Sequence, residues 1–464
     1  MAPLARAFIG SYVLDPYFQP YESAINLAAA KFHDGVSASP SASSSIRRDN
    51  PYRLLTARNV GMTAIMLFAH EGDGSSPGPA SSVSDLKSTE LGFGAGDMAN
   101  KGAVGLRFLY GKEGAETELT FVSTHLQAFE WNLETRNKNW ASIVSGLLFE
   151  DPKKHFTSPQ QGSEDGDEAR DLLLRRDQQG NAREKALHDI SIYKPGSHLF
   201  VSGDLNYRIS ATSPEAGAVF PSLDESSPNH YSHFLSRDQL TAEKSAGRTL
   251  QGLSEAEIRF PPTYKLKIAP STPTTTTRNP NSGSDDEVEL LGDLEDEEVE
   301  WKWATHRWPG WCDRILYLDI PWWTNGATTS SPSDRTKTPQ MDVRAYDALP
   351  AVRTSDHRGV YLRIGVPMLS TDELAPTEAV VEAELARHAG ADAEGQDDRE
   401  EDGGLVDPRI KLPFPINPDA WAHRALVKHW ERALGWSILV SNSRPAITLA
   451  TIIIIGLGAW WFSS

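Results

Sequence analysis

Cysteine is almost absent from this chain of 464 residues, since the single thiol belongs to Cys312. One thiol excludes an intrachain disulfide framework and a thiolate metal cluster, and it fits a reducing compartment. It also excludes a cysteine-dependent phosphatase, because Leu318 occupies the sixth position after Cys312, where the phosphate-binding arginine would be required. The hydrophobic fraction of 39% is still enough to form a sizeable core, so we expect a folded chain with polar stretches in it.

Positive charge is also scarce, with 45 Lys and Arg against 63 Asp and Glu and a net charge of -18. The acidic excess is local: residues 285–300 contain ten acids and no base, and residues 372–402 carry a net charge of -10. Without these two segments, which together account for -20, the rest of the chain is nearly neutral at +2. This distribution argues against a nucleic-acid partner, leaves an anionic substrate open, and identifies no protein partner.

Long uncharged runs are missing except at residues 446–462, AITLATIIIIGLGAWWF. As a helix, this run would span about 25 Å, slightly less than a hydrocarbon core of about 30 Å. The mismatch is smallest in a thin bilayer such as that of the endoplasmic reticulum, so we expect a transmembrane tail anchor there, with the preceding residues in the cytosol. A buried C-terminal helix is the alternative. The first residues, MAPLARAFIG, do not resemble a secretory signal.

The pattern of apolar residues divides the chain into four parts. In residues 1–368, short strand-like runs alternate with helical patterns, which predicts an α/β sandwich with polar insertions at about 71–88, 157–185 and 268–300. Residues 369–407 are acidic and predict a disordered linker. Residues 408–445 form a juxtamembrane segment with a helix, either on the bilayer or packed on the domain, and residues 446–462 are the anchor.

Polar side chains recur where the predicted strands begin or end, which is where loops usually place function. Carboxylates at several strand ends are costly for a core alone, but they make sense if they converge on a divalent cation while imidazoles and basic groups meet a phosphate. The residues concerned are His125, Asp204, Asn206, Tyr207, Arg208, Tyr264, Lys265, Asp313, Arg314, Asp356 and His357.

Six motifs together resemble the inositol polyphosphate 5-phosphatases of the endonuclease/exonuclease/phosphatase superfamily. They are NKGAV (100–104), STHL (123–126), GDLNYR (203–208), PPTYK (261–265), WCDRIL (311–316) and SDHRGV (355–360). With the uncharged C-terminal run, the chain is most similar to the fungal tail-anchored members of the endoplasmic reticulum. The resemblance implies a four-layer α/β/β/α sandwich for residues 1–368, Mg²⁺ as cofactor, and removal of the 5-phosphate from phosphatidylinositol 4,5-bisphosphate.

The resemblance also assigns catalytic roles. Asp204 would orient or deprotonate the attacking water, and Asn206 would hold the phosphoryl oxygens. His357 would donate to the scissile phosphate, with its ring oriented by Asp313. The same resemblance gives His125 a part in stabilising the transition state and puts Asp356 on the metal side of the site.

A second group of residues is assigned to the substrate. Tyr207, Arg208 and Lys265 resemble the contacts to the neighbouring 4-phosphate, and Asn100 and Lys101 are expected to bind a phosphate. Tyr264 and Arg314 complete the expected substrate-binding set.

Two features of the family are not found in the sequence: a strand with a Trp-Asn-type motif, and a Gln-Glu pair whose Glu is the principal Mg²⁺ ligand. The stretch APLARAFIGSYVLDPYF resembles the family segment directly after that Glu, so we expect the first strand to be missing. Either the sequence is a gene model begun at an internal Met, or it is a short form with an impaired metal site. The alternative function is therefore a membrane-tethered, phosphoinositide-binding pseudophosphatase. A nuclease or a sphingomyelinase is disfavoured, because GDLNYR and PPTYK suit a polyphosphorylated ring.

Overall fold

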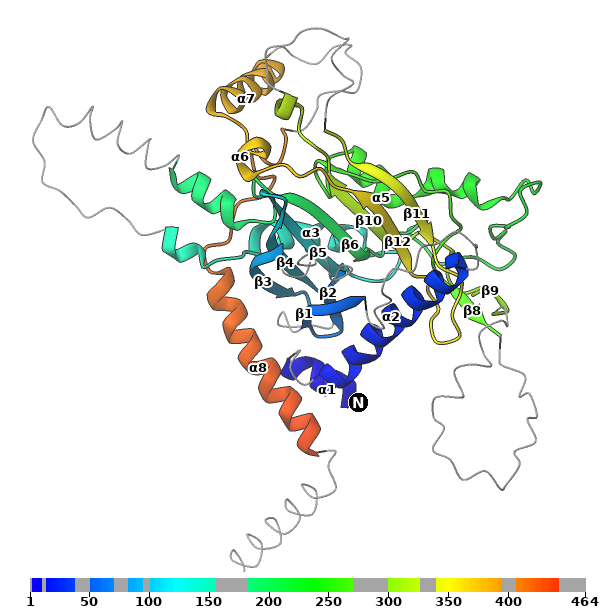
Figure 1. Ribbon diagram of the computed structural model, residues 1–464. Helices are drawn as coiled ribbons and strands as arrows, with labels where there is room; N and C mark the ends of the chain where they lie inside the picture. Colours follow the sequence, from blue (N-terminus) through cyan, green and yellow to red (C-terminus); the bar gives the residue numbers. More distant parts are fainter. Residues whose placement is uncertain are drawn as a thin grey trace, which may run out of the picture.

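The computed structural model describes residues 2–10, 14–37, 51–70, 82–94, 101–155, 182–269, 299–325, 339–393 and 406–441. Its centre is a six-stranded sheet in the order β3-β4-β5-β6-β10-β7 (Figure 1). The pair β5–β6 is parallel and the other pairs are antiparallel. The strands are β3 (Val83–Gly92), β4 (Gly102–Lys112), β5 (Ala115–His125), β6 (His198–Asp204), β7 (Leu253–Ser254) and β10 (Asp313–Leu318).

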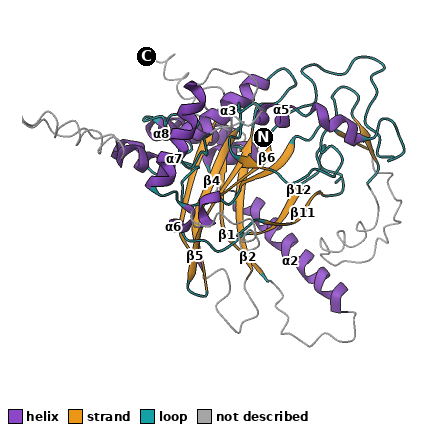
Figure 2. Cartoon of the chain, turned by 90° about the horizontal axis from the view of Figure 1, so that it is seen from above, coloured by secondary structure: helices purple, strands orange, loops and turns teal. Residues whose placement is uncertain are grey.

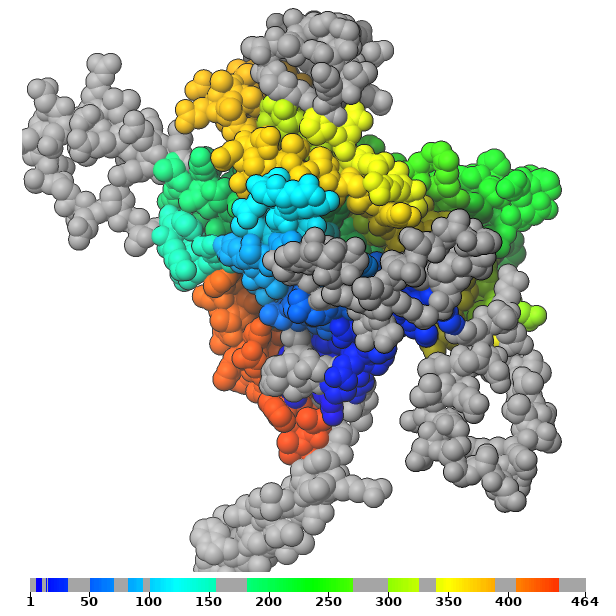
Figure 3. Space-filling model, viewed as in Figure 1, coloured from blue at the N-terminus to red at the C-terminus, as the bar shows by residue number. Residues whose placement is uncertain are grey.

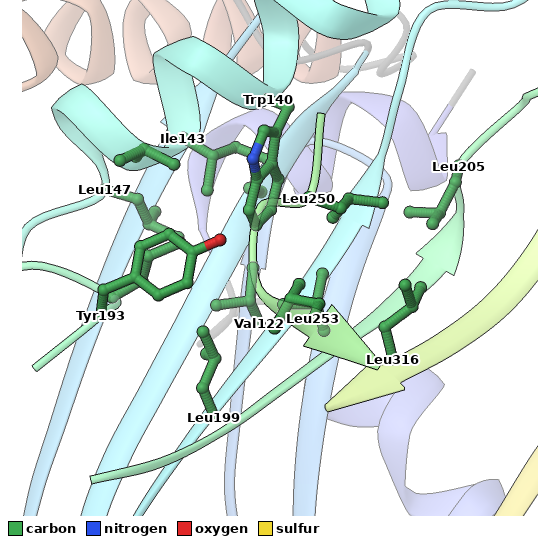
Figure 4. Close-up of a cluster of buried hydrophobic side chains, with 14 of the residues drawn as sticks. Val122, Trp140, Ile143, Leu147, Tyr193, Leu199, Leu205, Leu250, Leu253 and Leu316 are labelled. Carbon is green, nitrogen blue, oxygen red and sulfur yellow. The ribbon is translucent and has the colours of Figure 1, made fainter. Parts of the chain in front are cut away.

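One face of this sheet packs against helix α3 (Leu133–Gly146) and forms the main core. Figure 4 shows Trp140 and Ile143 of α3, and Leu147 directly after the helix, pointing toward side chains from the strands below. The indole nitrogen of Trp140 donates to Gln251 Oε1 at 2.9 Å, so this large aromatic is buried without losing its hydrogen bond. The short helices around this layer are η4 (Pro152–His155), η5 (Tyr231–Arg237), α5 (Gln239–Ser245) and η7 (Trp322–Asn325).

The opposite face is covered by hairpins. Ser123 Oγ of β5 donates to Ala64 O, which fixes the hairpin β1 (Tyr52–Val60) and β2 (Thr63–His70) on the sheet. The backbone N–H of Ile315 on β10 donates to Tyr346 Oη in the hairpin β11 (Asp342–Ala348) and β12 (Val360–Gly365). The short strands β8 (Leu266–Ile268) and β9 (Trp301–Trp303) form a further antiparallel pair. In the described residues the second β layer therefore consists of separate hairpins rather than one continuous sheet.

Helices α1 (Ala2–Ile9) and α2 (Asp15–Ser37) lie on the outer side of the β1–β2 hairpin (Figure 2). Leu14 and Phe18 pack there against Leu54 and Met66. The order helix, sheet, hairpin, helix agrees with the α/β fold expected from the sequence.

The acidic stretch 369–407, which was expected to be a disordered linker, is folded over residues 369–393, and this corrects the prediction there. It contains α6 (Thr371–Leu374), which begins with a capping box between Ser370 and Glu373, and α7 (Glu378–Ala393). The indole of Trp323 donates to the backbone oxygen of Leu374, and the Leu374 side chain is buried. The acidic composition hid these few apolar anchors and the cap. Residues 394–405 lie outside the described part.

The boundaries of the expected insertions are only partly visible. Strand β3 begins at Val83, inside the insertion placed at 71–88, so that insertion ends earlier than predicted. Residues 71–81, 156–181 and 270–298 are not described.

The helix expected in residues 408–445 is α8 (Ala420–Ser441), and it packs on the domain beside α1. The run 446–462 lies outside the described residues. Among the helices that are described, none is long and apolar enough to cross a bilayer.

Candidate active site

Three of the expected catalytic residues lie in one row across the sheet. His125 ends β5, Asp204 ends β6 and Asp313 begins β10, and the register pairs Asp204 with each of the other two. Residues paired in register project from the same face, and neighbouring strands are about 4.8 Å apart. The sequence therefore brings an imidazole and two carboxylates together at one end of the sheet.

The first pair in this row joins His125 and Asp204. Nε2 of His125 lies 3.0 Å from Oδ2 of Asp204, and the ammonium of Lys101 contacts the same ring nitrogen. Burial raises the pKa of Asp204. The His125 hydrogen bond and the positive charges of His125, His357 and Lys101 lower this pKa by a larger amount, so the net shift is downward. Asp204 is therefore a carboxylate at neutral pH, able to accept a hydrogen bond from a water molecule.

The second pair joins His357 and Asp313. Nδ1 of His357 lies 2.9 Å from Oδ2 of Asp313, and the Thr263 hydroxyl donates to the same oxygen at 2.7 Å. Burial raises the pKa of Asp313, and the hydrogen bond with His357 only partly opposes this shift. Burial lowers the pKa of His357, but the Asp313 hydrogen bond and the nearby carboxylate charges outweigh it, so its pKa is raised. Because Nδ1 faces Asp313, Nε2 is the ring nitrogen that can exchange a proton with a substrate.

A tight turn after β6 positions Asp204. Gly203 has φ 143°, and a Cβ on it would lie 1.9 Å from Thr124 O, so no other residue fits there. Asn206 follows with φ 57°, and its side-chain amide donates to Leu126 O at 3.1 Å. The turn is thus tied to the residue after His125.

An ion pair lies at the rim of the site. The Lys265 ammonium contacts Oδ2 of Asp356, and both side chains are partly exposed. Burial raises the pKa of Asp356, but the Lys265 hydrogen bond and charge, with the charge of His357, lower it overall. A lysine and a carboxylate are therefore both available to a ligand that enters here.

The described residues do not by themselves form a complete site for a divalent cation. They include no group of three or more His, Cys, Asp or Glu side chains placed to hold a metal. Asp356, the carboxylate that we assigned to the ion, is instead neutralised by Lys265. We therefore derive no step of the reaction through a metal.

Two predicted substrate contacts, Tyr207 and Arg314, are corrected by their burial and their hydrogen bonds. Tyr207 is 0% exposed, and its hydroxyl bonds Asn137 Oδ1 at 2.7 Å and Thr249 Oγ1 at 2.9 Å. Arg314 is 2% exposed and is held by two carboxylates, at 2.9 Å from Asp238 and 2.5 Å from Glu255. Neither side chain can reach a substrate. Arg208 is also buried, with its guanidinium 4.4 Å from the centre of the Tyr264 ring, but its Nη1 has no hydrogen-bond partner among the described residues, so its contact with a phosphate stays a prediction.

Two other assigned residues act as supports of the site. Asn206 is buried and uses its amide on Leu126 O and Arg208, so it is not free to hold phosphoryl oxygens as expected. The ring of Tyr264 is also buried, and its centre lies 4.7 Å from that of His357, which makes it the wall behind the imidazole rather than a substrate contact. Asn100 lies outside the described residues.

Two positioning residues could not be recognised in the sequence. Thr263 holds Asp313, and its only signal in the sequence was its place inside PPTYK. Arg136 of α3 is fully buried, donates to Phe129 O at 2.6 Å and to Gln239 Oε1 at 2.9 Å, and so fixes the loop after His125. A lone arginine in a helical pattern carries no signal for this role.

The chain is similar to known proteins over more than half of its length. The model of "Endonuclease/Exonuclease/phosphatase family 2" matches residues 19–363. The chain is 29% identical over 310 residues to inositol-1,4,5-trisphosphate 5-phosphatase 1 of Schizosaccharomyces pombe, covering 67% of this chain and 19% of that protein. It is 26% identical over 291 residues to type II inositol polyphosphate 5-phosphatase 14 of Arabidopsis thaliana, covering 62% of this chain and 21% of that protein.

One similar solved structure is the inositol polyphosphate 5-phosphatase domain of SpSynaptojanin in complex with inositol (1,4)-bisphosphate and a calcium ion. It is 22% identical to this chain, with a TM-score of 0.37, and the match covers 74% of this chain and 71% of that one. The chain spans about a fifth of the length of the two curated relatives. The family model, by contrast, covers well over half of the chain. The chain therefore belongs to endonuclease/exonuclease/phosphatase family 2.

Proposed function

We propose that this chain hydrolyses the 5-phosphate of phosphatidylinositol 4,5-bisphosphate, with Mg²⁺ as its cofactor. The observation that carries the proposal is the row of His125, Asp204 and Asp313, with His357 held on Asp313. A hydrophobic core does not need two imidazole–carboxylate pairs at adjoining strand ends, so a catalytic role explains them better. Lys101 and Lys265 add positive charge at the same place, which suits a phosphorylated ring.

The chemistry is derived from the state of each group. Hydrolysis of a phosphate monoester needs a positioned water, stabilisation of the charge on the phosphoryl oxygens, and a proton for the leaving oxygen. The ionised Asp204 can orient the water. His357, whose pKa is raised by its hydrogen bond to Asp313 despite burial, can carry a proton toward the phosphate from Nε2. Lys101 and Lys265 offset the negative charge of the substrate.

The test is phosphate release from vesicles containing phosphatidylinositol 4,5-bisphosphate, with and without Mg²⁺. Phosphatidylinositol 4-phosphate, which has no 5-phosphate, is the matched substrate, and Asp204→Asn is the matched protein control. We expect release only from the bisphosphate, only with Mg²⁺, and not from the variant. Equal release from both lipids would refute the assignment to the 5-phosphate.

A second candidate is a protein that binds the headgroup without hydrolysing it. It is favoured by the lack, among the described residues, of a three-ligand group for a cation. Binding of inositol 1,4,5-trisphosphate measured by calorimetry separates the candidates. Binding that weakens in Lys265→Met, without any phosphate release at any Mg²⁺ concentration, would establish the second candidate and overturn the first.

We further propose that residues 446–462 anchor the chain in the endoplasmic reticulum with residues 1–445 in the cytosol. The support is their uncharged sequence, which suits a thin bilayer. The full chain should stay with endoplasmic-reticulum membranes after carbonate extraction. A chain that lacks residues 446–464 should be released from them. Carbonate-resistant association of the shortened chain would place the anchor elsewhere.

A further inference from the structure

The first turn of helix α5 contacts the segments that carry the candidate active site. Asp238 caps this helix, since its carboxylate accepts from Thr241 N at 2.9 Å. The same Asp238 oxygen lies 2.9 Å from Nη1 of Arg314, the residue after Asp313. The start of α5 is therefore fixed to β10, and Gln239 follows at the next position.

Gln239 and Arg208 are 31 residues apart in sequence and are joined by two hydrogen bonds. The backbone N–H of Arg208 donates to Gln239 Oε1 at 2.9 Å, and the backbone N–H of Gln239 donates to Arg208 O at 2.9 Å. The side-chain nitrogen of Gln239 also donates to Ser210 O at 3.1 Å. Figure 3 shows the residues between them, in green, in a lobe that projects from one side of the molecule. Gln239 therefore ties the return of this lobe to the turn that begins with Asp204.

A second donor reaches the same oxygen of Gln239. Nη2 of Arg136, on α3, donates to Gln239 Oε1 at 2.9 Å, and Nη1 of Arg136 donates to Phe129 O at 2.6 Å. Phe129 lies in the loop after His125 and has φ 74°, a conformation that persists only where the surrounding bonds hold it. The side-chain oxygen of Gln239 thus accepts two hydrogen bonds, as many as its lone pairs allow. It joins the turn after β6 to the loop after β5.

The turn and the loop also meet at a second point. Leu126 N donates to Asp204 O at 3.0 Å, and Asn206 Nδ2 donates to Leu126 O at 3.1 Å. The two segments are therefore joined at Leu126 on one side and through Gln239 on the other, which closes a ring of hydrogen bonds. Nε2 of His125, next to Leu126, lies 3.0 Å from Oδ2 of Asp204. The first imidazole–carboxylate pair of the site is thus part of the structure that this ring holds.

We propose that Gln239 is a positioning residue for the reaction, which holds the turn after β6 and the loop after β5 in one relative orientation. It acts through Arg208 and Arg136 and does not need to touch the substrate. A segment attached at one point can swing about it, whereas a second point of attachment fixes its direction. Asp204 and His125 must be held within about 0.5 Å to act together. The catalytic part of this inference rests on the proposed function, and the hydrogen-bond ring does not.

The catalytic part is tested by two substitutions of Gln239. Gln239→Met removes the amide and nearly keeps the length of the side chain. Because a misplacement of about 1 Å can cost about a hundredfold in rate, kcat for phosphate release from phosphatidylinositol 4,5-bisphosphate should fall about ten- to hundredfold, with a smaller change in KM. Gln239→Glu keeps two acceptor oxygens for Arg136 and Arg208 and loses only the donation to Ser210 O, so it should recover most of kcat. A larger effect on KM than on kcat, or no recovery in Gln239→Glu, would overturn the proposal.

Lys244→Met is the matched control on the same helix. Lys244 Nζ donates to Leu253 O at 2.9 Å, so this variant removes a hydrogen bond between α5 and β7. We expect it to lower the free energy of unfolding in urea, as Gln239→Met does, and to leave kcat unchanged. An equal fall in kcat would show that α5 acts only through its stability, and it would refute a specific role for Gln239.

Hydrogen exchange tests the ring without relying on activity. In Gln239→Met, backbone amides should exchange faster in peptides that cover residues 204–210 and also in peptides that cover residues 126–132, because the loss of one contact releases both segments. Lys244→Met should change neither segment. Faster exchange in residues 204–210 alone would overturn the coupling, since Gln239 would then support only its own neighbours. Faster exchange in both segments would support the ring even if the unmodified chain released no phosphate, a result that would refute the proposed function instead.

Discussion

The imidazole of His357 and the carboxylate of Asp313 are joined at 2.9 Å although 44 residues separate them in sequence. Asp313 begins β10, and His357 lies just before β12, so the pair links the six-stranded sheet to one of the hairpins that cover it. Thr263 donates to the same carboxylate oxygen and fixes its direction. The ring of His357 is thereby held in one orientation with Nε2 available.

Asp313→Asn should lower kcat for phosphate release by about 10² or more, because the amide cannot stabilise a protonated imidazole. We expect the double variant Asp313→Asn/His357→Ala to lose little more of kcat than either single variant, since the two residues work as a unit. The measurement is single-turnover release from phosphatidylinositol 4,5-bisphosphate. Thr263→Val removes only the hydrogen bond that orients the Asp313 carboxylate, and it should lower kcat much less. Additive losses in the double variant would show that the two groups act separately.

Lys265→Met should weaken the preference for lipids that carry a 4-phosphate. Hydrogen bonds to charged groups contribute about 1.5–3 kcal/mol, so kcat/KM for the 4,5-bisphosphate should fall about ten- to hundredfold. Activity on phosphatidylinositol 5-phosphate should fall much less. Lys267→Met, an exposed lysine two residues away, is the matched control. If Lys265→Met reduced both activities equally, the lysine would serve the reaction or its partner Asp356 and not the 4-phosphate.

Tyr207→Phe tests the correction made by the structure. The hydroxyl is buried on Asn137 and Thr249, so its removal should cost about 1–3 kcal/mol of unfolding free energy and leave the 4-phosphate preference unchanged. Urea denaturation and the ratio of kcat/KM for the two lipids measure these effects. A changed lipid preference at unchanged stability would show that Tyr207 contacts the substrate after all.

The sequence predicted which residues converge, because strand ends can be recognised from local patterns. His125, Asp204 and Asp313 each border an apolar run, and the sheet brings such borders into one row. The environment of a charged side chain could not be predicted in the same way. Arg314 looked available, yet its partners Glu255 and Asp238 lie 59 and 76 residues away in sequence. Only the tertiary fold decides whether such a group is buried.

The same reasoning explains the helices α6 and α7, which the sequence placed in a disordered linker. Composition averages over the segment, but the side chains of Leu374 and Val380 are individually buried. The capping box of Ser370 and Glu373 was a local signal that could have predicted the start of α6.

Stability should fall as the pH drops from about 6.5 toward 4, because two buried histidines resist protonation. Nε2 of His188 donates to Pro408 O at 2.8 Å, and burial lowers the pKa of His188 to about 4; burial lowers the pKa of His198 to about 4 as well. In the unfolded chain both groups titrate near 6.5, so between these values the unfolded state binds more protons and is favoured. At or above pH 7 both are neutral in either state and the full stability is present.

Urea denaturation at pH 7 and pH 5 measures this effect, which amounts to about 2 kcal/mol per histidine. His188→Gln should remove about half of the histidine-dependent loss, whatever its own effect on stability at pH 7. His233→Gln, at an exposed position, should leave the difference between the two pH values unchanged. The stability of His188→Gln could instead show the same pH dependence as that of the unmodified chain. His188 of the unmodified chain would then be protonated in the folded state or paired with an acid there. Its burial beneath Pro408 would then not control the acid sensitivity of the fold.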